Sequence, residues 1–238
     1  MKKRKVGIGI FVIVLIITAV RVKSMDSHRI SGRILAENIA GPGMMRLVEQ
    51  SMQAQAQKTS VTEIAVKEWK HPQAALTFDD GPDIRYTPLL LDGLKERNVR
   101  ASFFLLGEKV EQYPELVERM QKEGHLVGNH TYHHVQLNKL NETKAREEIL
   151  KTNNLIYETT GVYPLYLRPP FGAWKKNLEL CVEMLPVFWT IDTLDWKVQN
   201  TEKIVHTVQE QIEDGAIILM HDEYDTSVEA ALQVADDL

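Results

Sequence analysis

From Gln73 onward, short apolar segments alternate with longer segments of helical pattern, and this alternation restricts the possible folds most strongly. Apolar runs of strand-like length separated by helices are typical of a parallel sheet covered by those helices. The expected strands span residues 74–78, 101–106, 125–128, 165–167, 186–191 and 216–220. The sequence therefore predicts an α/β fold with a parallel sheet, but the periodicity leaves open whether that sheet closes into a barrel.

Residues with strong preferences for helix ends delimit the expected helices. The predicted helix-starting residues are Thr87 (followed by Pro88), Pro114, Glu142, Thr201 and Ser227, and the predicted stops are Gly124, Gly161 and Gly215. The helix that starts at Glu142 should extend to Thr160, and the last helix should run to the end of the chain.

The N-terminal part of the chain has the pattern of an export signal. Four basic residues, Lys2 to Lys5, precede an apolar run from Val6 to Val20, and Arg21 and Lys23 follow it. We expect residues 1–23 to be an uncleaved membrane anchor with its positive end inside, because no convincing cleavage site follows the run. A removed signal peptide, which would give a secreted protein, is the alternative. In both cases the rest of the chain would lie outside the cytoplasm.

The rest of the chain divides into a linker and one large domain. Residues 24–70 are predicted to be a stalk, broken at Gly41-Pro42-Gly43 and ending in a possible strand at residues 61–66. Residues 71–238 are long enough for one domain with a substantial core. The formal net charge of −5, without a basic stripe beyond the N-terminus, argues against a nucleic-acid partner. We expect a monomer, and the single cysteine, Cys181, excludes an intrachain disulfide.

Unusual polar residues follow the carboxyl ends of the expected strands, which is the edge where β/α folds build active sites. Asp79 and Asp80 come directly after the first strand. Adjacent carboxylates repel each other, so a folded protein that confines both usually supplies a cation. A solvated turn is the alternative, because Asp, Gly and Pro are common turn residues.

Two histidines follow the third expected strand. His130 and His134 are four residues apart, so on a helical turn they share a face and can bind one ion. An isolated pair of this kind is weak evidence, but Asp80 at the same edge supplies a third ligand. Two histidines and one carboxylate leave coordination positions open for water and substrate.

Three further segments at this edge have residues suited to catalysis. Arg168-Pro-Pro-Phe-Gly172 is a rigid loop that can present a backbone N–H to an oxyanion, and Arg168 can orient a carboxylate. Asp192-Thr-Leu-Asp-Trp196 places a tryptophan, suited to stacking on a sugar ring, beside acidic groups. His221 ends an apolar strand and suits general acid–base catalysis.

Together these segments resemble the polysaccharide deacetylases of the NodB-homology type, family four of the carbohydrate esterases. Five motifs match in order: Thr77-Phe-Asp-Asp-Gly-Pro82, His130-Thr-Tyr-His-His134, Arg168-Pro-Pro-Phe-Gly172, Asp192-Thr-Leu-Asp-Trp196 and Ile218-Leu-Met-His-Asp222. Each motif is modest alone, but five in order over nearly the whole folded part are specific. The resemblance implies a distorted (β/α) barrel, here preceded by the membrane segment and the stalk.

The resemblance also implies the role of each residue at this edge. Asp80, His130 and His134 would hold a divalent cation, zinc or cobalt, which would polarise the acetamide carbonyl and activate water. Asp79, oriented by Arg168, would be the general base. The backbone N–H of Phe171 would bind the oxyanion. His221, oriented by Asp195, would donate the proton to the leaving amine. Leu219 and Trp196 would line the pocket for the acetyl group and the sugar.

The implied reaction is removal of N-acetyl groups from N-acetylglucosamine units of a cell-surface polysaccharide. An exported, membrane-anchored domain would face the cell wall, so peptidoglycan is the first expected substrate. Chitin oligomers, an exported poly-N-acetylglucosamine and acetylxylan are the alternatives. Two other classes remain open: a non-catalytic carbohydrate-binding relative, and an iron oxygenase with the same ligand types.

The chain departs from the family pattern in two places. Phe171 replaces the tyrosine that is more usual there, which matters little if only its backbone N–H is used. Family members generally continue into a final strand, whereas this chain reaches Leu238 inside the expected last helix. We expect either that the sequence is truncated or that residues 61–66 fill the place of that strand.

Overall fold

The computed structural model describes residues 72–174, 182 and 184–238 of the 238-residue chain. The predicted anchor at residues 1–23 lies outside the described residues. So does the whole predicted stalk at residues 24–70, including the possible strand at 61–66. None of the described helices has the length and apolar character needed to traverse a bilayer. The anchor and its cleavage state therefore stay predictions.

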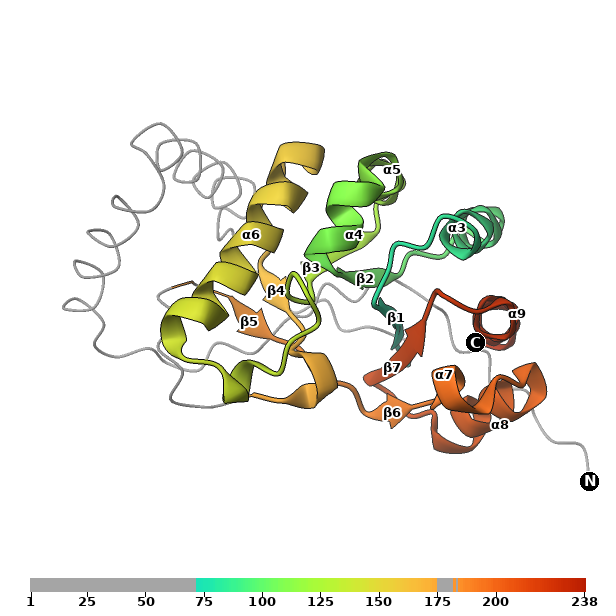
Figure 1. Ribbon diagram of the computed structural model, residues 1–238. Helices are drawn as coiled ribbons and strands as arrows, with labels where there is room; N and C mark the ends of the chain where they lie inside the picture. The colour runs from blue at the N-terminus through green and yellow to red at the C-terminus, as the bar shows by residue number, and fades with distance from the viewer. Residues whose placement is uncertain (1–71, 175–181, 183) are drawn as a thin grey trace, which may run out of the picture. The chain divides into compact units, whose positions relative to one another are not determined.

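The described residues form one parallel sheet of seven strands in the order β5-β4-β3-β2-β1-β7-β6 (Figure 1). Every neighbouring pair is parallel. The strands are β1 (Ala74–Asp79), β2 (Ser102–Leu105), β3 (Leu126–Asn129), β4 (Tyr166–Leu167), β5 (Leu185–Pro186), β6 (Ile191–Asp192) and β7 (Ala216–His221). The α/β fold with a parallel sheet, predicted from the alternating pattern, is thus confirmed.

Helices connect the strands and lie around the outer side of the curved sheet (Figure 1). They are α3 (Tyr86–Glu96), α4 (Gly107–Gln112), α5 (Pro114–Lys122), α6 (Glu142–Thr160), α7 (Asp195–Val198), α8 (Thr201–Gln211) and α9 (Asp225–Asp237), with 3-10 turns η1 (Leu137–Lys139) and η2 (Pro170–Gly172). The predicted bounds of α6 are confirmed, and Gly161 ends that helix with a left-handed φ of 70°. Pro114 opens α5, also as predicted.

The predicted single strand at 186–191 is wrong, because the structure divides this segment between the two ends of the sheet. Pro186 of β5 pairs with Leu167 of β4, whereas Ile191 of β6 pairs with Ile218 of β7. A continuous apolar run looks like one strand in the sequence, and only the tertiary pairing separates its halves. β5 and β6 are the end strands and do not pair with each other in the described part. The distorted barrel that the family resemblance implies is therefore open here, as a curved sheet.

Three predicted helix caps are also wrong. Thr87, Thr201 and Ser227 lie inside the first turns of α3, α8 and α9 instead of preceding them. For α8, the cap is Asn200, whose side chain accepts a hydrogen bond from the backbone N–H of Lys203. The hydroxyls of Thr87 and Ser227 bind buried carboxylates, as described below.

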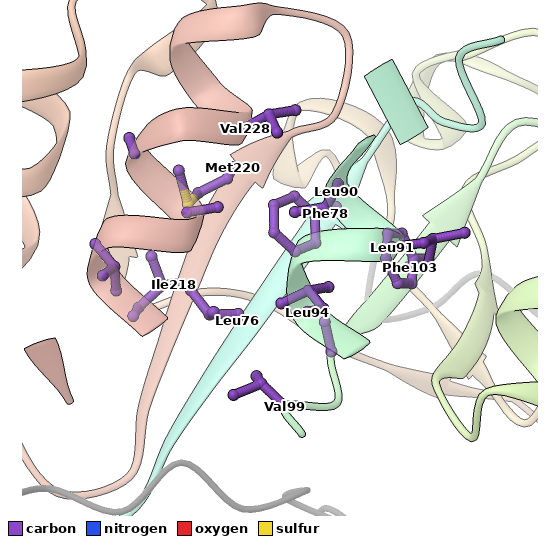
Figure 2. Close-up of a cluster of buried hydrophobic side chains, with 14 of the residues drawn as sticks. Leu76, Phe78, Leu90, Leu91, Leu94, Val99, Phe103, Ile218, Met220 and Val228 are labelled. Carbon is purple, nitrogen blue, oxygen red and sulfur yellow. The ribbon is translucent and has the colours of Figure 1, made fainter. Parts of the chain in front are cut away.

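The main core lies between the sheet and the helices that cover it, with α3, α5, α8 and α9 contributing buried residues; Figure 2 shows the part of it around Leu76, Leu94 and Val228. Leu76 and Phe78 of β1 are about 1% exposed, and Leu94 of α3 is completely buried in the same cluster. The alternate residues Thr77 and Asp79 therefore point to the opposite face of β1, because successive side chains of a strand alternate. Packing on one face of β1 thus directs its polar residues to the other.

Leu94 offers a test of this packing. Leu94→Ala should lower the free energy of unfolding by about 2–5 kcal/mol, because it removes buried methyl groups and leaves a cavity. Leu89→Ala on the same helix is the matched control, since Leu89 is 54% exposed. Chemical denaturation should show little change for the control. Equal losses in the two variants would contradict the assigned core.

Candidate active site

The carboxyl ends of the parallel strands bring the predicted residues to one edge of the sheet. The register aligns Asp79 at the end of β1 with His221 at the end of β7. On the other side of β1, β2 leads to β3, whose last residue Asn129 aligns with Leu167 of β4. The residues that follow these strand ends, His130 and Arg168 among them, therefore converge although they are far apart in the sequence.

Three predicted metal ligands lie together at this edge. One ligand atom each from Asp80, His130 and His134 lies within 4.8 Å of the other two. The Nε2 atoms of both histidines are 3.3 Å from Oδ1 of Asp80. The loop that follows β1 turns sharply at Asp80, whose φ is 68°, and this turn directs the carboxylate toward the histidines.

The donor set has the properties that a divalent cation requires. Nδ1 of His130 donates a hydrogen bond of 2.7 Å to the carbonyl of Arg168, so its Nε2 keeps a lone pair for coordination. Oδ1 of Asp80 is buried and has no hydrogen-bond donor in the part of the chain described here. A buried carboxylate oxygen without a partner is costly, and a cation would satisfy it. Two imidazoles and one carboxylate suit zinc or cobalt.

The protonation states of the ligand groups agree with this reading. Burial opposes ionisation of Asp80, but interaction with His130 and the charges of His134 and His221 lower the pKa of Asp80 to about 2. Burial lowers the pKa of His134 below its ordinary value, although Asp80 acts in the opposite direction. At neutral pH the carboxylate is therefore ionised, and His134 favours the neutral form that can bind a metal.

Asp79 is held by a buried guanidinium group. Nη1 of Arg168 is 2.8 Å from Oδ1 of Asp79 and donates another hydrogen bond of 2.8 Å to Oγ1 of Thr77. The side chain of Arg168 is completely buried, and its guanidinium lies 4.2 Å from the ring centre of Phe104. The structure thus places Arg168 against Asp79, and the orienting role of Arg168 stays a prediction. Thr77, which the sequence analysis assigned only to a motif, completes this contact.

His221 is fixed by a fully buried carboxylate. Its Nδ1 and backbone N lie 2.7 Å from Oδ1 and Oδ2 of Asp195, respectively. Oδ2 also accepts a 2.7 Å hydrogen bond from the hydroxyl of Ser227. Burial acts against the imidazolium, but the hydrogen bond and charge of Asp195 and the charges of Asp80 and Asp79 raise the pKa of His221 to about 9. His221 is therefore protonated at neutral pH, and its Nε2 lies 3.9 Å from Oδ2 of Asp80.

The predicted pocket residues occupy different environments. Phe171 is 62% exposed, has a φ of 59°, and its ring lies 4.5 Å from that of His134. Leu219 is buried two residues before His221 on β7 and thus faces the same side of the sheet. Trp196 is half exposed on the short helix α7, next to Asp195. Their roles in binding stay predictions.

A buried carboxyl group that the sequence analysis left without a role supports the loop after β1. Asp222 is completely buried and accepts a hydrogen bond from Thr87 of α3. A Cβ at Gly81 would collide with the carboxyl group of Asp222, so only glycine allows this close approach. The same contact links the residue after His221 to the residue after Asp80. No local sequence signal indicated it, because the partners are distant in the chain.

The site and fold define a family of enzymes. Residues 67–188 match the sequence profile of the family described as polysaccharide deacetylase, which is just over half of the 238-residue chain. The chain therefore belongs to the polysaccharide deacetylase family, and the family resemblance read from the five motifs is confirmed.

Two individual relatives and one solved structure are similar to this chain. The peptidoglycan-N-acetylglucosamine deacetylase of Bacillus cereus is 44% identical over 152 residues, covering 63% of this chain and 55% of the relative. The peptidoglycan-N-acetylmuramic acid deacetylase PdaC of Bacillus subtilis is 42% identical over 160 residues, covering 67% of this chain and 34% of PdaC. A solved structure of PdaC, 41% identical, aligns with a TM-score of 0.68 over 70% of this chain and 83% of that structure. The chain thus spans only about a third to a half of these relatives' full lengths.

Asp222 gives a prediction for the pH dependence of stability. Burial raises its pKa to about 7 from an ordinary 3.8, although the hydrogen bond from Thr87 opposes the shift. The folded state therefore holds this proton more tightly than the unfolded state, and the stability from protonation is lost as the pH rises from about 4 to about 7. Asp222→Asn removes the titration but keeps the shape and an acceptor oxygen.

The free energy of unfolding of Asp222→Asn relative to the unchanged protein should thus rise between pH 4 and pH 8, by on the order of 2–4 kcal/mol. Urea titrations of the two metal-free proteins at several pH values provide the measurement. A difference that does not vary with pH would show that Asp222 titrates normally.

Proposed function

We propose that this protein is a divalent-metal-dependent hydrolase that removes N-acetyl groups from N-acetylglucosamine units of peptidoglycan. One observation carries the proposal. Three separate constellations meet at one edge of the sheet: an Asp-His-His donor set, an aspartate bound to a buried arginine, and a histidine fixed by a buried aspartate. Metal-dependent amide hydrolysis needs a cation site, a general base and a general acid, and each has a candidate here.

The residues of the chain would divide the reaction as follows. A divalent cation held by Asp80, His130 and His134 would polarise the acetamide carbonyl and lower the pKa of water. Asp79, held in place by Arg168, accepts the proton of the attacking water. The backbone N–H of Phe171 donates to the oxyanion.

Collapse of the tetrahedral intermediate requires a proton for the departing amine. We assign this proton to His221, because the hydrogen bond and the charge of Asp195 stabilise its imidazolium form. Asp195 orients the ring through the hydrogen bond at Nδ1, which leaves the Nε2 proton for transfer. The C–N bond breaks, and acetate and a free glucosamine unit are the products.

The relatives support peptidoglycan as the substrate class and leave two sugars to distinguish. The Bacillus cereus relative is named for N-acetylglucosamine and PdaC for N-acetylmuramic acid. We favour N-acetylglucosamine, which the higher identity to the Bacillus cereus enzyme supports. Chitin oligomers, poly-N-acetylglucosamine and acetylxylan are the competing substrates.

We further propose that residues 1–23 anchor the protein in the cell membrane with the catalytic domain outside.

Two other functions agree less well with the residues present. A non-catalytic relative would usually have lost the base, a metal ligand or the acid, whereas Asp79, Asp80 and His221 are all in place. An iron oxygenase also uses two histidines and a carboxylate, but it has no use for Asp79 or for His221.

Acetate release tests the proposed function. The zinc- or cobalt-loaded protein should release acetate from peptidoglycan faster than from chitin oligomers or acetylxylan, and a chelator should abolish the release. Asp79→Asn should bind the metal but react at least about a hundredfold more slowly, as expected for loss of a general base. Loaded protein that releases no acetate from any of these polymers would refute the proposal, and equal metal loss in Asp79→Asn and Asp80→Asn would refute the division of roles.

The leaving-group dependence tests the role of His221. His221→Ala should slow deacetylation of N-acetylglucosamine oligomers by about two or more orders of magnitude, because an amine leaves poorly without a proton. Hydrolysis of an activated aryl acetate should be affected much less, since its phenolate leaves without such help. His206→Ala, at an exposed position of α8, is the control and should match the unchanged protein on both substrates. Equal losses of His221→Ala on both would point to a structural role.

A further inference from the structure

The loop that carries both histidine ligands has an unusual backbone conformation. It follows β3, and two of its residues, Thr131 and His134, have left-handed φ angles of 67° and 55°. Such angles are unfavourable for residues with a Cβ and persist only where surrounding contacts enforce them. The approach of both histidines to Asp80 depends on this conformation, so the contacts that enforce it matter for the site.

Glu148 of α6 makes the most extensive of these contacts. Its Oε2 accepts hydrogen bonds from the backbone N–H groups of Tyr132, at 3.0 Å, and His133, at 2.9 Å. Its Oε1 lies 2.8 Å from Nδ1 of His133. The side chain of Glu148 is only 16% exposed, whereas that of His133 is 58% exposed. One carboxylate thus holds three donors in the turn that separates the two ligands.

The two ligands differ in how much they depend on this turn. His130 is 2% exposed and is also fixed by its hydrogen bond to the carbonyl of Arg168. Thr131 next to it is held by the side chain of Asn129 and by the N–H of Gly107. His134 is 30% exposed in its side chain and is positioned by ring packing against His130 and Phe171. His134 therefore relies on the backbone path through residues 132–133.

We propose that Glu148 is a positioning residue for the metal site: it fixes the 132–133 turn so that His134 reaches the same ion as His130 and Asp80. Glu148 touches neither the ion nor the substrate, and it acts through the backbone of the loop. The inference rests on the proposed function only in taking Asp80, His130 and His134 as ligands. It adds a residue outside the five motifs on which the family resemblance rests.

Glu148→Gln is the sharpest variant, because it keeps the size of the side chain and one acceptor oxygen. Its amide NH₂ would meet donor groups where the second carboxylate oxygen now accepts. Loss of a contact that orients a metal ligand typically lowers metal affinity about 10–100-fold, and we expect a loss in this range for Zn²⁺. Glu147→Gln is the matched control: it makes the same charge change at the adjacent, exposed position, and its affinity should stay within about twofold of the unchanged protein.

The full chain and both variants should be titrated with Zn²⁺ against a chromophoric chelator, and the visible absorption of their Co²⁺ forms recorded at saturation. The Co²⁺ spectrum of Glu148→Gln should differ from that of the unchanged protein, because a displaced His134 alters the ligand geometry. Glu147→Gln should reproduce the unchanged spectrum. Urea denaturation of the metal-free proteins shows what fraction of each variant is folded, so that affinities refer to folded protein.

The outcomes separate this inference from the proposed function. If the unchanged protein does not bind Zn²⁺, the ligand set of the proposed function is wrong. If it binds and Glu148→Gln has the same affinity and the same Co²⁺ spectrum, the ligand set stands and the positioning role of Glu148 is wrong. An affinity loss fully accounted for by unfolded protein, with an unchanged Co²⁺ spectrum, also contradicts the inference.

Discussion

The site depends on the completely buried guanidinium group of Arg168. A cation in the interior of a protein is unfavourable unless it is paired and hydrogen-bonded, so its surroundings must be arranged around it. Its Nη1 binds Asp79 and Thr77 of β1, across the sheet from β4. Its own backbone carbonyl accepts the Nδ1 proton of His130. One residue therefore orients the proposed base through its side chain and a proposed metal ligand through its main chain.

The residues at the edge of the sheet could be predicted because of how parallel strands work. Strands that are connected by helices all point the same way, so residues after their carboxyl ends meet without any knowledge of the loops. This is why Asp79, Asp80, His130 and His221 were grouped from the sequence, and the structure places them together. The five ordered motifs then gave these residues their predicted roles.

The features that could not be predicted from the sequence depend on contacts between distant segments. The split of residues 186–191 between two ends of the sheet is decided by which neighbouring strand each half meets. Glu148 lies on a polar helix face and looks like a solvated residue until the fold brings the histidine loop against it. Asp222 and Gly81 are likewise linked only in three dimensions. Local sequence patterns do not reveal such long-range contacts.

The wrongly predicted caps show how the helices are tied to the site. A hydroxyl near a helix start was expected to satisfy the free N–H groups of its own helix. Thr87 and Ser227, in the first turns of α3 and α9, instead donate hydrogen bonds to Asp222 and Asp195, respectively. Asp222 follows His221 in the sequence, and Asp195 binds the His221 ring. Two of the helices that build the main core thus also hold carboxyl groups next to the proposed acid. The positions of these carboxyl groups therefore depend on how α3 and α9 pack in the core.

The division of residues 185–192 between the two end strands has a geometric consequence for the whole sheet. Neighbouring strands are about 4.8 Å apart, so the path across seven strands measures about 29 Å along the sheet. The chain from Pro186 to Ile191 can span at most about 18 Å, because each residue extends it by no more than about 3.6 Å. A sheet about 29 Å across whose end strands are joined by at most about 18 Å of chain must curve through about half a circle. The segment between β5 and β6 therefore restrains the curvature, and the sheet cannot flatten unless this segment is lengthened or an end strand detaches.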